Sequence, residues 1–254
     1  MPLVRPSPLS GWTVLSLRPR GQHASVRAAC ARVGARLLAL SVLAISARDD
    51  IATRRDLAAA LAADAVIFTS PNAVRTAAAL LPLRARRGQS LLAVGTGTQR
   101  ALARLGIAAA APGRMDSEGL LDLPALADPR GHSLGLVTGS GGRGLLAPTL
   151  IAHGAVLRRA DVYLREAVRL GVARIAALKG ALRHPQRVLL VLTSAEALAG
   201  LLAQVDDPRL RGVAVVAASP RLAQLARASG FDRVATAASA RPAALLAAAA
   251  SVFE

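Results

Sequence analysis

The sequence predicts an α/β protein built from two similar lobes, each a parallel sheet flanked by helices. Two observations support this fold class. Short apolar runs alternate with longer stretches of helical spacing along most of the chain, which is the pattern of βαβ units. The chain also repeats itself at constant offsets, and such repeats indicate duplicated structural units.

The apolar runs are expected to form the strands. Stretches of helical spacing separate most of them, for example at 71–81 and 220–228, and parallel strands need crossovers of this kind. The expected strands are 13–17, 37–45, 65–69, 90–94, 133–138, 155–164, 187–193, 213–218 and 233–237.

The internal repeat has two offsets, 124 and 120 residues. At 124, Thr69-Ser70 matches Thr193-Ser194, and Gly106 matches Gly230. At 120, Gly34-Ala35 matches Gly154-Ala155. The repeat leaves the threading open, because two sequential lobes with a boundary near Arg130 and a lobe inserted into the other both fit. The runs 37–45 and 155–164 are candidates for paired strands that cross between lobes.

Composition narrows the function. The 254 residues carry a net charge of +17 and are 53% hydrophobic but only 2% aromatic. A strongly basic chain suits nucleic acid, a membrane surface or an acidic small molecule. Few aromatic side chains and scattered arginines argue against nucleic acid. The chain has no apolar run of membrane-spanning length and no export signal, so we expect a soluble, cytoplasmic protein, and we expect it to be a monomer. The net charge favours a polyanionic small molecule as its partner.

Metal and cofactor chemistry has little support. The single cysteine, Cys30, excludes an internal disulfide. None of the four histidines is paired with Cys, Asp or Glu at the spacing of metal ligands, so we expect no metal.

Small hydroxylated residues stand where expected strands pass into helices. One interpretation is helix N-capping, which Ser and Thr favour. The other is anion binding, because helix N-termini present free N–H groups and a partial positive charge. These ends are Thr69-Ser70, Gly95-Thr96, Thr138-Gly139-Ser140, Thr193-Ser194 and Ser219-Pro220.

Two further features have alternative interpretations. The segment from Gly139 to Gly144 fits G-x-G-x-x-G after a strand, with Asp161 further on. This predicts either a nicotinamide dinucleotide site or an anion-binding turn. Tyr163, the only tyrosine, ends an apolar strand. It is either a half-buried structural residue or a phenol that donates a proton to a leaving group.

Taken in order, several motifs resemble those of the uroporphyrinogen-III synthase family over nearly the whole chain. The motifs are Val66-Ile-Phe-Thr-Ser-Pro-Asn-Ala-Val74, Ala93-Val-Gly-Thr-Gly-Thr98, Asp116-Ser-Glu-Gly-Leu-Leu121, Gly141-Gly-Arg143-Gly144, Val162-Tyr163, Leu192-Thr-Ser194 and Ser219-Pro-Arg221.

The resemblance implies an inserted-lobe architecture. Residues 11–36 and 167–254 would form one lobe, and 48–154 the other. Residues 37–47 and 155–166 would be connector strands. It also implies a cofactor-free reaction in a cleft between the lobes. Hydroxymethylbilane, which carries eight carboxylates, would lose water and close with inversion of ring D to uroporphyrinogen III. Transient hand-over from hydroxymethylbilane synthase is a further expectation.

The same resemblance assigns residue roles. Tyr163 matches the residue expected to assist departure of the substrate hydroxyl. The residues expected to bind substrate are Arg18, Ser70, Thr96, Ser117, Arg143, Thr193, Ser194 and Ser219. Two other functions stay open from the sequence: a two-lobed small-anion-binding protein without catalysis, and an NAD(P)-dependent oxidoreductase that uses Gly139–Gly144.

Overall fold

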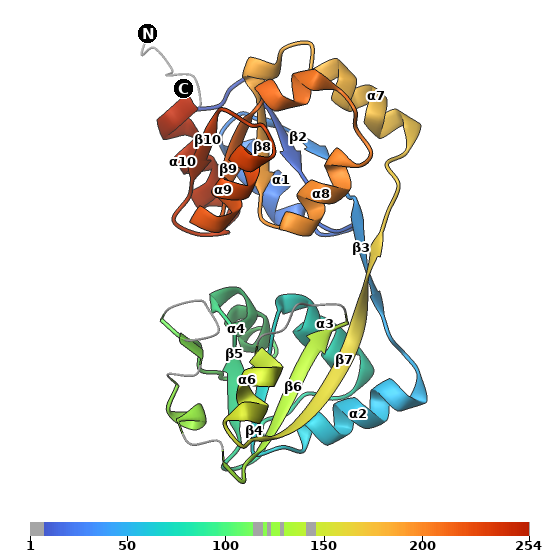
Figure 1. The fold of residues 1–254 in the computed structure, drawn as a ribbon, viewed down its shortest axis with the longest axis vertical. Helices are drawn as coiled ribbons and strands as arrows, with labels where there is room; N and C mark the ends of the chain where they lie inside the picture. The colour runs from blue at the N-terminus through green and yellow to red at the C-terminus, as the bar shows by residue number, and fades with distance from the viewer. Residues whose placement is uncertain (1–7, 114–118, 121–122, 128–129, 141–145, 254) are drawn as a thin grey trace. The chain divides into compact units, whose positions relative to one another are not determined.

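The chain divides into two compact units in the computed structural model, which describes residues 8–113, 119–120, 123–127, 130–140 and 146–253 (Figure 1). Unit 1 comprises Met1–Ala44 and Glu166–Glu254, and unit 2 comprises Ile45–Arg165. The chain therefore passes from unit 1 into unit 2 and returns once.

Unit 1 contains a five-stranded sheet in the order β10-β9-β8-β1-β2, and all its neighbouring strands are parallel. The strands are β1 (Thr13–Ser16), β2 (Arg36–Ala39), β8 (Val188–Leu192), β9 (Ala214–Ala217) and β10 (Val234–Thr236). The helices are α1 (Ala24–Arg32), α7 (Val172–Ala181), α8 (Ala195–Leu202), α9 (Pro220–Ala228) and α10 (Pro242–Phe253), with short 3₁₀ turns at Pro185–Arg187 and Pro208–Gly212.

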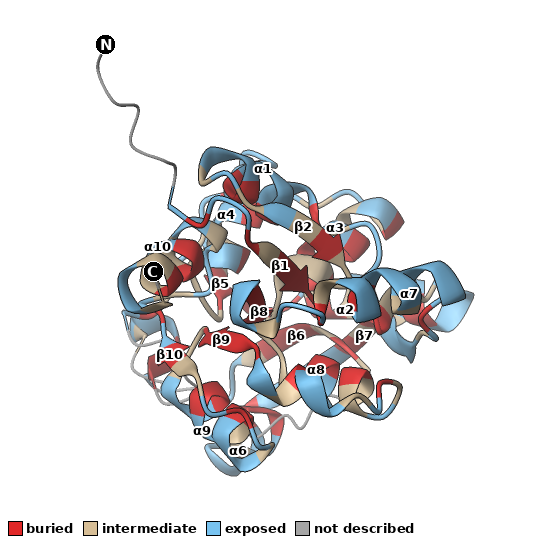
Figure 2. Ribbon diagram, turned by 90° about the horizontal axis from the view of Figure 1, so that it is seen from above, coloured by how far each residue is buried: buried red, intermediate tan, exposed pale blue. Residues whose placement is uncertain are grey.

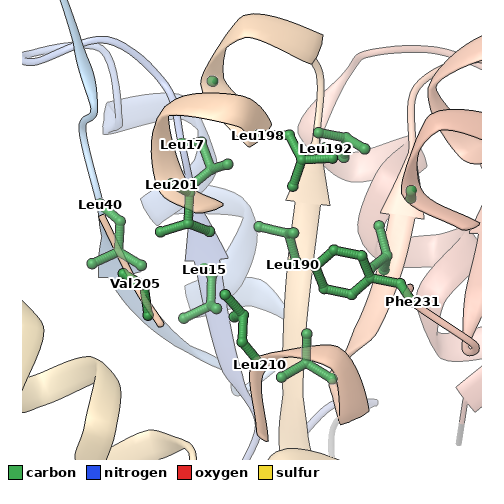
Figure 3. Close-up of a cluster of buried hydrophobic side chains, with 14 of the residues drawn as sticks. Leu15, Leu17, Leu40, Leu190, Leu192, Leu198, Leu201, Val205, Leu210 and Phe231 are labelled. Carbon is green, nitrogen blue, oxygen red and sulfur yellow. The ribbon is translucent and has the colours of Figure 1, made fainter. Parts of the chain in front are cut away.

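Both faces of this sheet are covered by helices. Leu15 and Leu190 pack on one face with α7, α8 and α9, in the cluster drawn in Figure 3. Val14 and Leu189 pack on the other face with α1 and α10. Successive strand residues point to opposite faces, so burial on both faces requires the continuous apolar runs seen in the sequence. Figure 2 shows the result, since β1 and β9 are buried while the outer sides of the helices are exposed.

Unit 2 has a five-stranded sheet in the order β3-β7-β6-β4-β5. The strands are β3 (Leu43–Ala47), β4 (Ala65–Phe68), β5 (Ser90–Ala93), β6 (Ser133–Gly139) and β7 (Val156–Ala167), and the helices are α2 (Ile51–Leu61), α3 (Pro71–Leu80), α4 (Thr96–Ala103) and α6 (Leu146–Ala152), with a 3₁₀ turn at Pro124–Leu126. β4, β5, β6 and β7 pair in parallel. β3 runs antiparallel to β7, because Arg48 bonds to Val162 and Val168 bonds to Val42.

Four strands of one sheet match four strands of the other in order and register, which confirms the predicted pair of similar lobes. The order β5-β4-β6-β7 in unit 2 corresponds to β9-β8-β1-β2 in unit 1. The pair Ala65–Ser90 corresponds to Leu189–Ala214 at the 124-residue offset. The pair Ser133–Val156 corresponds to Thr13–Arg36 at the 120-residue offset. Strand order and register are thus the same for these four strands, whereas the fifth strand is β10 beside β9 in unit 1 and the antiparallel β3 beside β7 in unit 2.

The expected strand 37–45 is wrong as a single element. The structure divides it into β2 and β3, which belong to different sheets. Between them Leu40 and Val42 are buried in the core of unit 1, so the apolar run continues across the break and hides it. Residues 37–47 are therefore not one strand. By contrast, the expected strand 155–164 is the single strand β7.

Candidate functional site

Three serines begin helices at the carboxyl edges of the two sheets. Ser70 caps α3 after β4, Ser194 caps α8 after β8, and Ser219 caps α9 after β9. Each Oγ accepts the backbone N–H three residues on, at 3.0 Å for Ser70, 3.3 Å for Ser194 and 3.4 Å for Ser219. The capping interpretation is therefore confirmed at these positions. Each hydroxyl still has its own proton to donate.

Tyr163 lies on β7 with its side chain fully buried, at 0% exposure. The half-buried environment expected from the sequence is therefore wrong. The ring packs on Gly139 at the end of β6, where an added Cβ would lie only 2.3 Å from the ring atom Cζ of Tyr163. Packing against Tyr163 thus explains why a glycine stands at position 139, whether or not the dinucleotide motif that begins there binds a nucleotide.

The hydroxyl of Tyr163 has two polar neighbours. It shares a hydrogen bond with Ser70 Oγ at 3.1 Å, in which either oxygen can be the donor. The Nη2 of Arg165 donates to it at 3.3 Å, and the guanidinium lies 5.8 Å from the ring centroid. Arg165 was not among the predicted site residues. The two-residue period of a strand could have revealed it, because residues two apart share a face.

Hydroxyl and backbone contacts join the ends of β4 and β6 to each other and to β7 at Tyr163. Thr69 Oγ1 donates to Thr138 Oγ1 at 2.8 Å. The N–H of Ser140 donates to the carbonyl oxygen of Tyr163 at 2.9 Å. The phenol therefore lies in a group of polar contacts at adjacent strand ends, and we call Tyr163, Ser70 and Arg165 the tyrosine cluster.

Thr96 and the start of α4 lie beside the tyrosine cluster in unit 2. Thr96 is the first residue of α4, which begins where β5 ends. A Cβ added to the neighbouring Gly97 would be 3.6 Å from Pro71 at the start of α3, so the two helix starts are adjacent. Two other predicted residues, Ser117 and Arg143, lie outside the described residues, as does most of the segment Gly139–Gly144.

The remaining predicted residues belong to unit 1. Thr193 and Ser194 follow β8, and Ser219 follows β9. Arg18 follows β1, and its Nη2 donates to the carbonyl oxygen of Ala240 at 3.4 Å. Since β1, β8 and β9 are neighbours, these side chains share the carboxyl edge of one sheet. The predicted set is thus divided between the units, with Ser70, Thr96 and Tyr163 in unit 2.

Metal-ligating clusters and membrane-spanning helices are absent from the described residues. No three His, Cys, Asp or Glu side chains of the described part of the chain are grouped as metal ligands would be. Among the same residues, no helix has both the length and the apolar character needed to cross a bilayer.

Comparison with known proteins agrees with this architecture. A structure of a mutant uroporphyrinogen III synthase from the bacterium Thermus thermophilus is 21% identical, covers 93% of this chain and 96% of its own, and has a TM-score of 0.61. The uroporphyrinogen-III synthetase of Helicobacter pylori 26695 is 15% identical, covers 94% and 99%, and has a TM-score of 0.65. At these identities the likeness shows the fold. No curated protein sequence matches significantly.

The family follows from the sequence itself. The family model described as uroporphyrinogen-III synthase HemD matches residues 24–247, which include both sheets except β1. The chain therefore belongs to the uroporphyrinogen-III synthase family of cyclising lyases, which act on a small-molecule tetrapyrrole substrate.

Proposed function

We propose that the chain performs the reaction of its family with the tyrosine cluster as its proton source. The enzyme cyclises hydroxymethylbilane to uroporphyrinogen III, with loss of water and inversion of ring D. The observation that carries the residue assignment is the buried phenol of Tyr163, in hydrogen-bond contact with both Ser70 and Arg165.

The first chemical step needs a proton. The substrate hydroxyl leaves as water once it is protonated, and the pyrrole it leaves becomes an electrophilic azafulvenium cation. Tyr163 is fully buried, whereas Ser70 is half-buried. The proposed path therefore runs from the phenol to Ser70 Oγ and from Ser70 to the leaving hydroxyl. The Arg165 guanidinium, which donates to the phenolic oxygen, stabilises the phenolate that this transfer leaves.

The second step needs no protein nucleophile, because a pyrrole carbon of the substrate attacks the azafulvenium cation. Bonding through the substituted carbon of ring D gives a spiro intermediate. The bond from that carbon to its old bridging methylene then breaks and leaves a second azafulvenium cation, which the free α-carbon of ring D attacks. That carbon loses its proton as the ring regains aromaticity, and this proton balances the one given up by Tyr163. The protein must instead hold the chain so that the substituted carbon of ring D, rather than its free α-carbon, makes the first bond. Such selection is positioning and electrostatic work.

The substrate carboxylates account for the remaining predicted residues. Helix N-termini bind carboxylates through their free N–H groups and dipole, and the net charge of +17 favours a polyanion. We assign carboxylate binding to Thr96 in unit 2 and to Arg18, Thr193, Ser194 and Ser219 in unit 1. Ser117 and Arg143 are proposed for the same role from the sequence alone.

The function is tested by the isomer that forms. Hydroxymethylbilane is generated enzymatically, incubated with the protein, and the oxidised uroporphyrin isomers are resolved. Isomer III is expected, since the spontaneous reaction gives isomer I. A product containing only isomer I refutes the proposal.

Hand-over of substrate from hydroxymethylbilane synthase is a separate proposal, supported by the tendency of the substrate to close spontaneously. Mixing the two enzymes should give less isomer I than separating them by a dialysis membrane, and equal fractions would contradict it. The cytoplasmic location expected from the sequence stays a prediction.

A further inference from the structure

Unit 1 contains a pocket whose charged lining the proposed reaction leaves unused. Its volume is about 450 Å³, near the small end of the range for ligand pockets, which is about 300–1,000 Å³. We call it the arginine pocket, and its polar lining consists of Arg20, His23, Arg27, Ser41, Arg169 and Arg174.

Three chain segments meet at the arginine pocket. Arg20 and Arg27 come from the β1–α1 segment, Ser41 from the link between β2 and β3, and Arg169 and Arg174 from the segment that follows β7 and begins α7. Residues distant in sequence thus place four arginines in the lining of one cavity. Among the described residues that line it there is no Asp or Glu.

None of these four guanidinium groups is neutralised within the described part of the chain. The hydrogen bonds and ion pairs found there include none from the side chains of Arg20, Arg27, Arg169 or Arg174. Arginines elsewhere differ, since Arg159 pairs with Asp161 at 2.9 Å. Like charges gathered without a counter-charge repel one another, and an anion between them relieves that repulsion.

His23 provides a second, independent polar feature. Its side chain is 8% exposed, and its ring nitrogens contact Ser16 Oγ at 3.1 Å and Ser41 Oγ at 2.8 Å. Burial lowers the pKa of His23 below its ordinary value of 6.5, and the charges of Arg18, Arg27 and Arg174 lower it further. The buried ring therefore experiences the positive field of the pocket.

The helix starts at the pocket also lack the capping seen elsewhere. No side-chain oxygen caps α1 at His23 or α7 at Gly171, whereas Ser194 and Ser219 cap α8 and α9. The N-cap residues of both helices, His23 and Gly171, line the cavity. The first-turn N–H groups of these helices add to the attraction for an anion.

We propose that the arginine pocket binds a small oxyanion, a carboxylate or a phosphate group. This goes beyond the proposed function, because free phosphate and an acid side chain of the substrate offer the same chemistry. Only the second source rests on the proposed function. An anion bound here contacts the start of α1 together with the segments that lead to β3 and from β7.

The test compares two pairs of arginine substitutions. Arg27→Ala/Arg174→Ala removes two pocket charges. The control, Arg32→Ala/Arg36→Ala, removes two exposed charges of unit 1 that do not line the arginine pocket. Both lower the net charge equally. Arg27→Gln/Arg174→Gln serves if the alanine pair fails to fold.

The first probe is inorganic phosphate at constant ionic strength, followed through the ring signals of His23 in NMR spectra, which His23→Gln assigns. The second is uroporphyrin III, an octacarboxylate, followed by fluorescence. We expect the pocket pair to weaken binding of at least one probe about tenfold and the control pair to change it less than about twofold.

Each outcome has a distinct meaning. Pocket-dependent phosphate binding identifies a site for free anions. Dependence confined to uroporphyrin III identifies the substrate's acid side chains as the source. If neither probe distinguishes the two pairs, the proposal is overturned. If phosphate binding depends on the pocket arginines but no isomer III forms, the proposed function is refuted while the proposal of an anion site in the arginine pocket stands.

Discussion

Replacing Tyr163 with Phe removes the phenolic oxygen and keeps the ring. The ring fills the space beside Gly139, so packing is retained. The substitution loses the contact with Ser70 Oγ at 3.1 Å and the one with Arg165 Nη2 at 3.3 Å. Its effect therefore reports on the hydroxyl alone.

The expected magnitudes differ for stability and turnover. A net hydrogen bond contributes about 0.5–1.5 kcal/mol, and Ser70 and Arg165 can each reach water. The loss should be about 1 kcal/mol, or a melting temperature lower by about 2–4 °C. Turnover should fall about tenfold or more, the low end for a lost general acid, which corresponds to about 1.4 kcal/mol in the barrier.

The assay follows uroporphyrinogen formation from enzymatically generated hydroxymethylbilane and resolves the isomers after oxidation. The spontaneous reaction competes, so a slow variant shows both a lower rate and a larger fraction of isomer I. An unchanged rate and isomer ratio would refute the role of the hydroxyl.

A structural contribution is separated by two serine substitutions. Ser70→Ala loses a helix cap and the contact with Tyr163, whereas Ser194→Ala, at the equivalent repeat position, loses a cap without such a contact, so its melting temperature gives the cost of the cap. Each lost cap costs about 1 kcal/mol. Tyr163→Phe and Ser70→Ala should reduce turnover less than additively, because they interrupt one proton path. Fully additive effects would contradict the relay through Ser70.

Three further predictions concern single residues. Gly139→Ala should cost about 1–3 kcal/mol through overpacking against Tyr163, whereas Gly97→Ala, whose Cβ meets Pro71 only at 3.6 Å, should not; equal melting temperatures would contradict this. Folding lowers the pKa of His23, so the unfolded chain takes up a proton on this residue more readily than the folded protein. The free energy of unfolding is therefore unaffected by the titration of His23 above its unfolded pKa of about 6.5, and it declines as the pH falls from there toward the folded pKa. Denaturant midpoints should therefore fall less steeply with acid in His23→Gln than in the wild type. Burial raises the pKa of Cys30 to about 11, so iodoacetamide at about pH 8, below the ordinary thiol pKa, should label it only after unfolding, and rapid labelling of the native protein would refute its burial.

Much of the fold could be predicted from the sequence because it depends on local pattern. Strands of a sheet buried on both faces are continuous apolar runs, and helices covering them have a helical period. The repeat supplied more, since the offsets that align Thr69 with Thr193 and Gly34 with Gly154 are those that relate the registers of the two sheets. The break between β2 and β3 was missed because Leu40 and Val42, which lie within it, are buried in the core and continue the apolar run.

The site could be predicted only in part. Ser70, Ser194 and Ser219 were identified because a hydroxyl at a strand-to-helix junction has a local function as a cap. The hydrogen-bond partners of Tyr163 depend on which strands are neighbours in the sheet. No local sequence pattern predicts that strand order. The same holds for the arginine pocket, where Arg27 and Arg174 are far apart in sequence.

The sequence by itself determined two similar, mostly parallel sheets, their helices and the family, because hydrophobic period and repeated motifs are properties of the chain. The antiparallel pairing of β3 with β7 departs from the predicted parallel sheet. Only the tertiary structure decided that Tyr163 is fully buried against Gly139 and that four arginines surround one cavity without a counter-charge among its described lining residues. Burial and electrostatic potential depend on distances between segments remote in sequence, and packing of the sheet and its helices sets those distances.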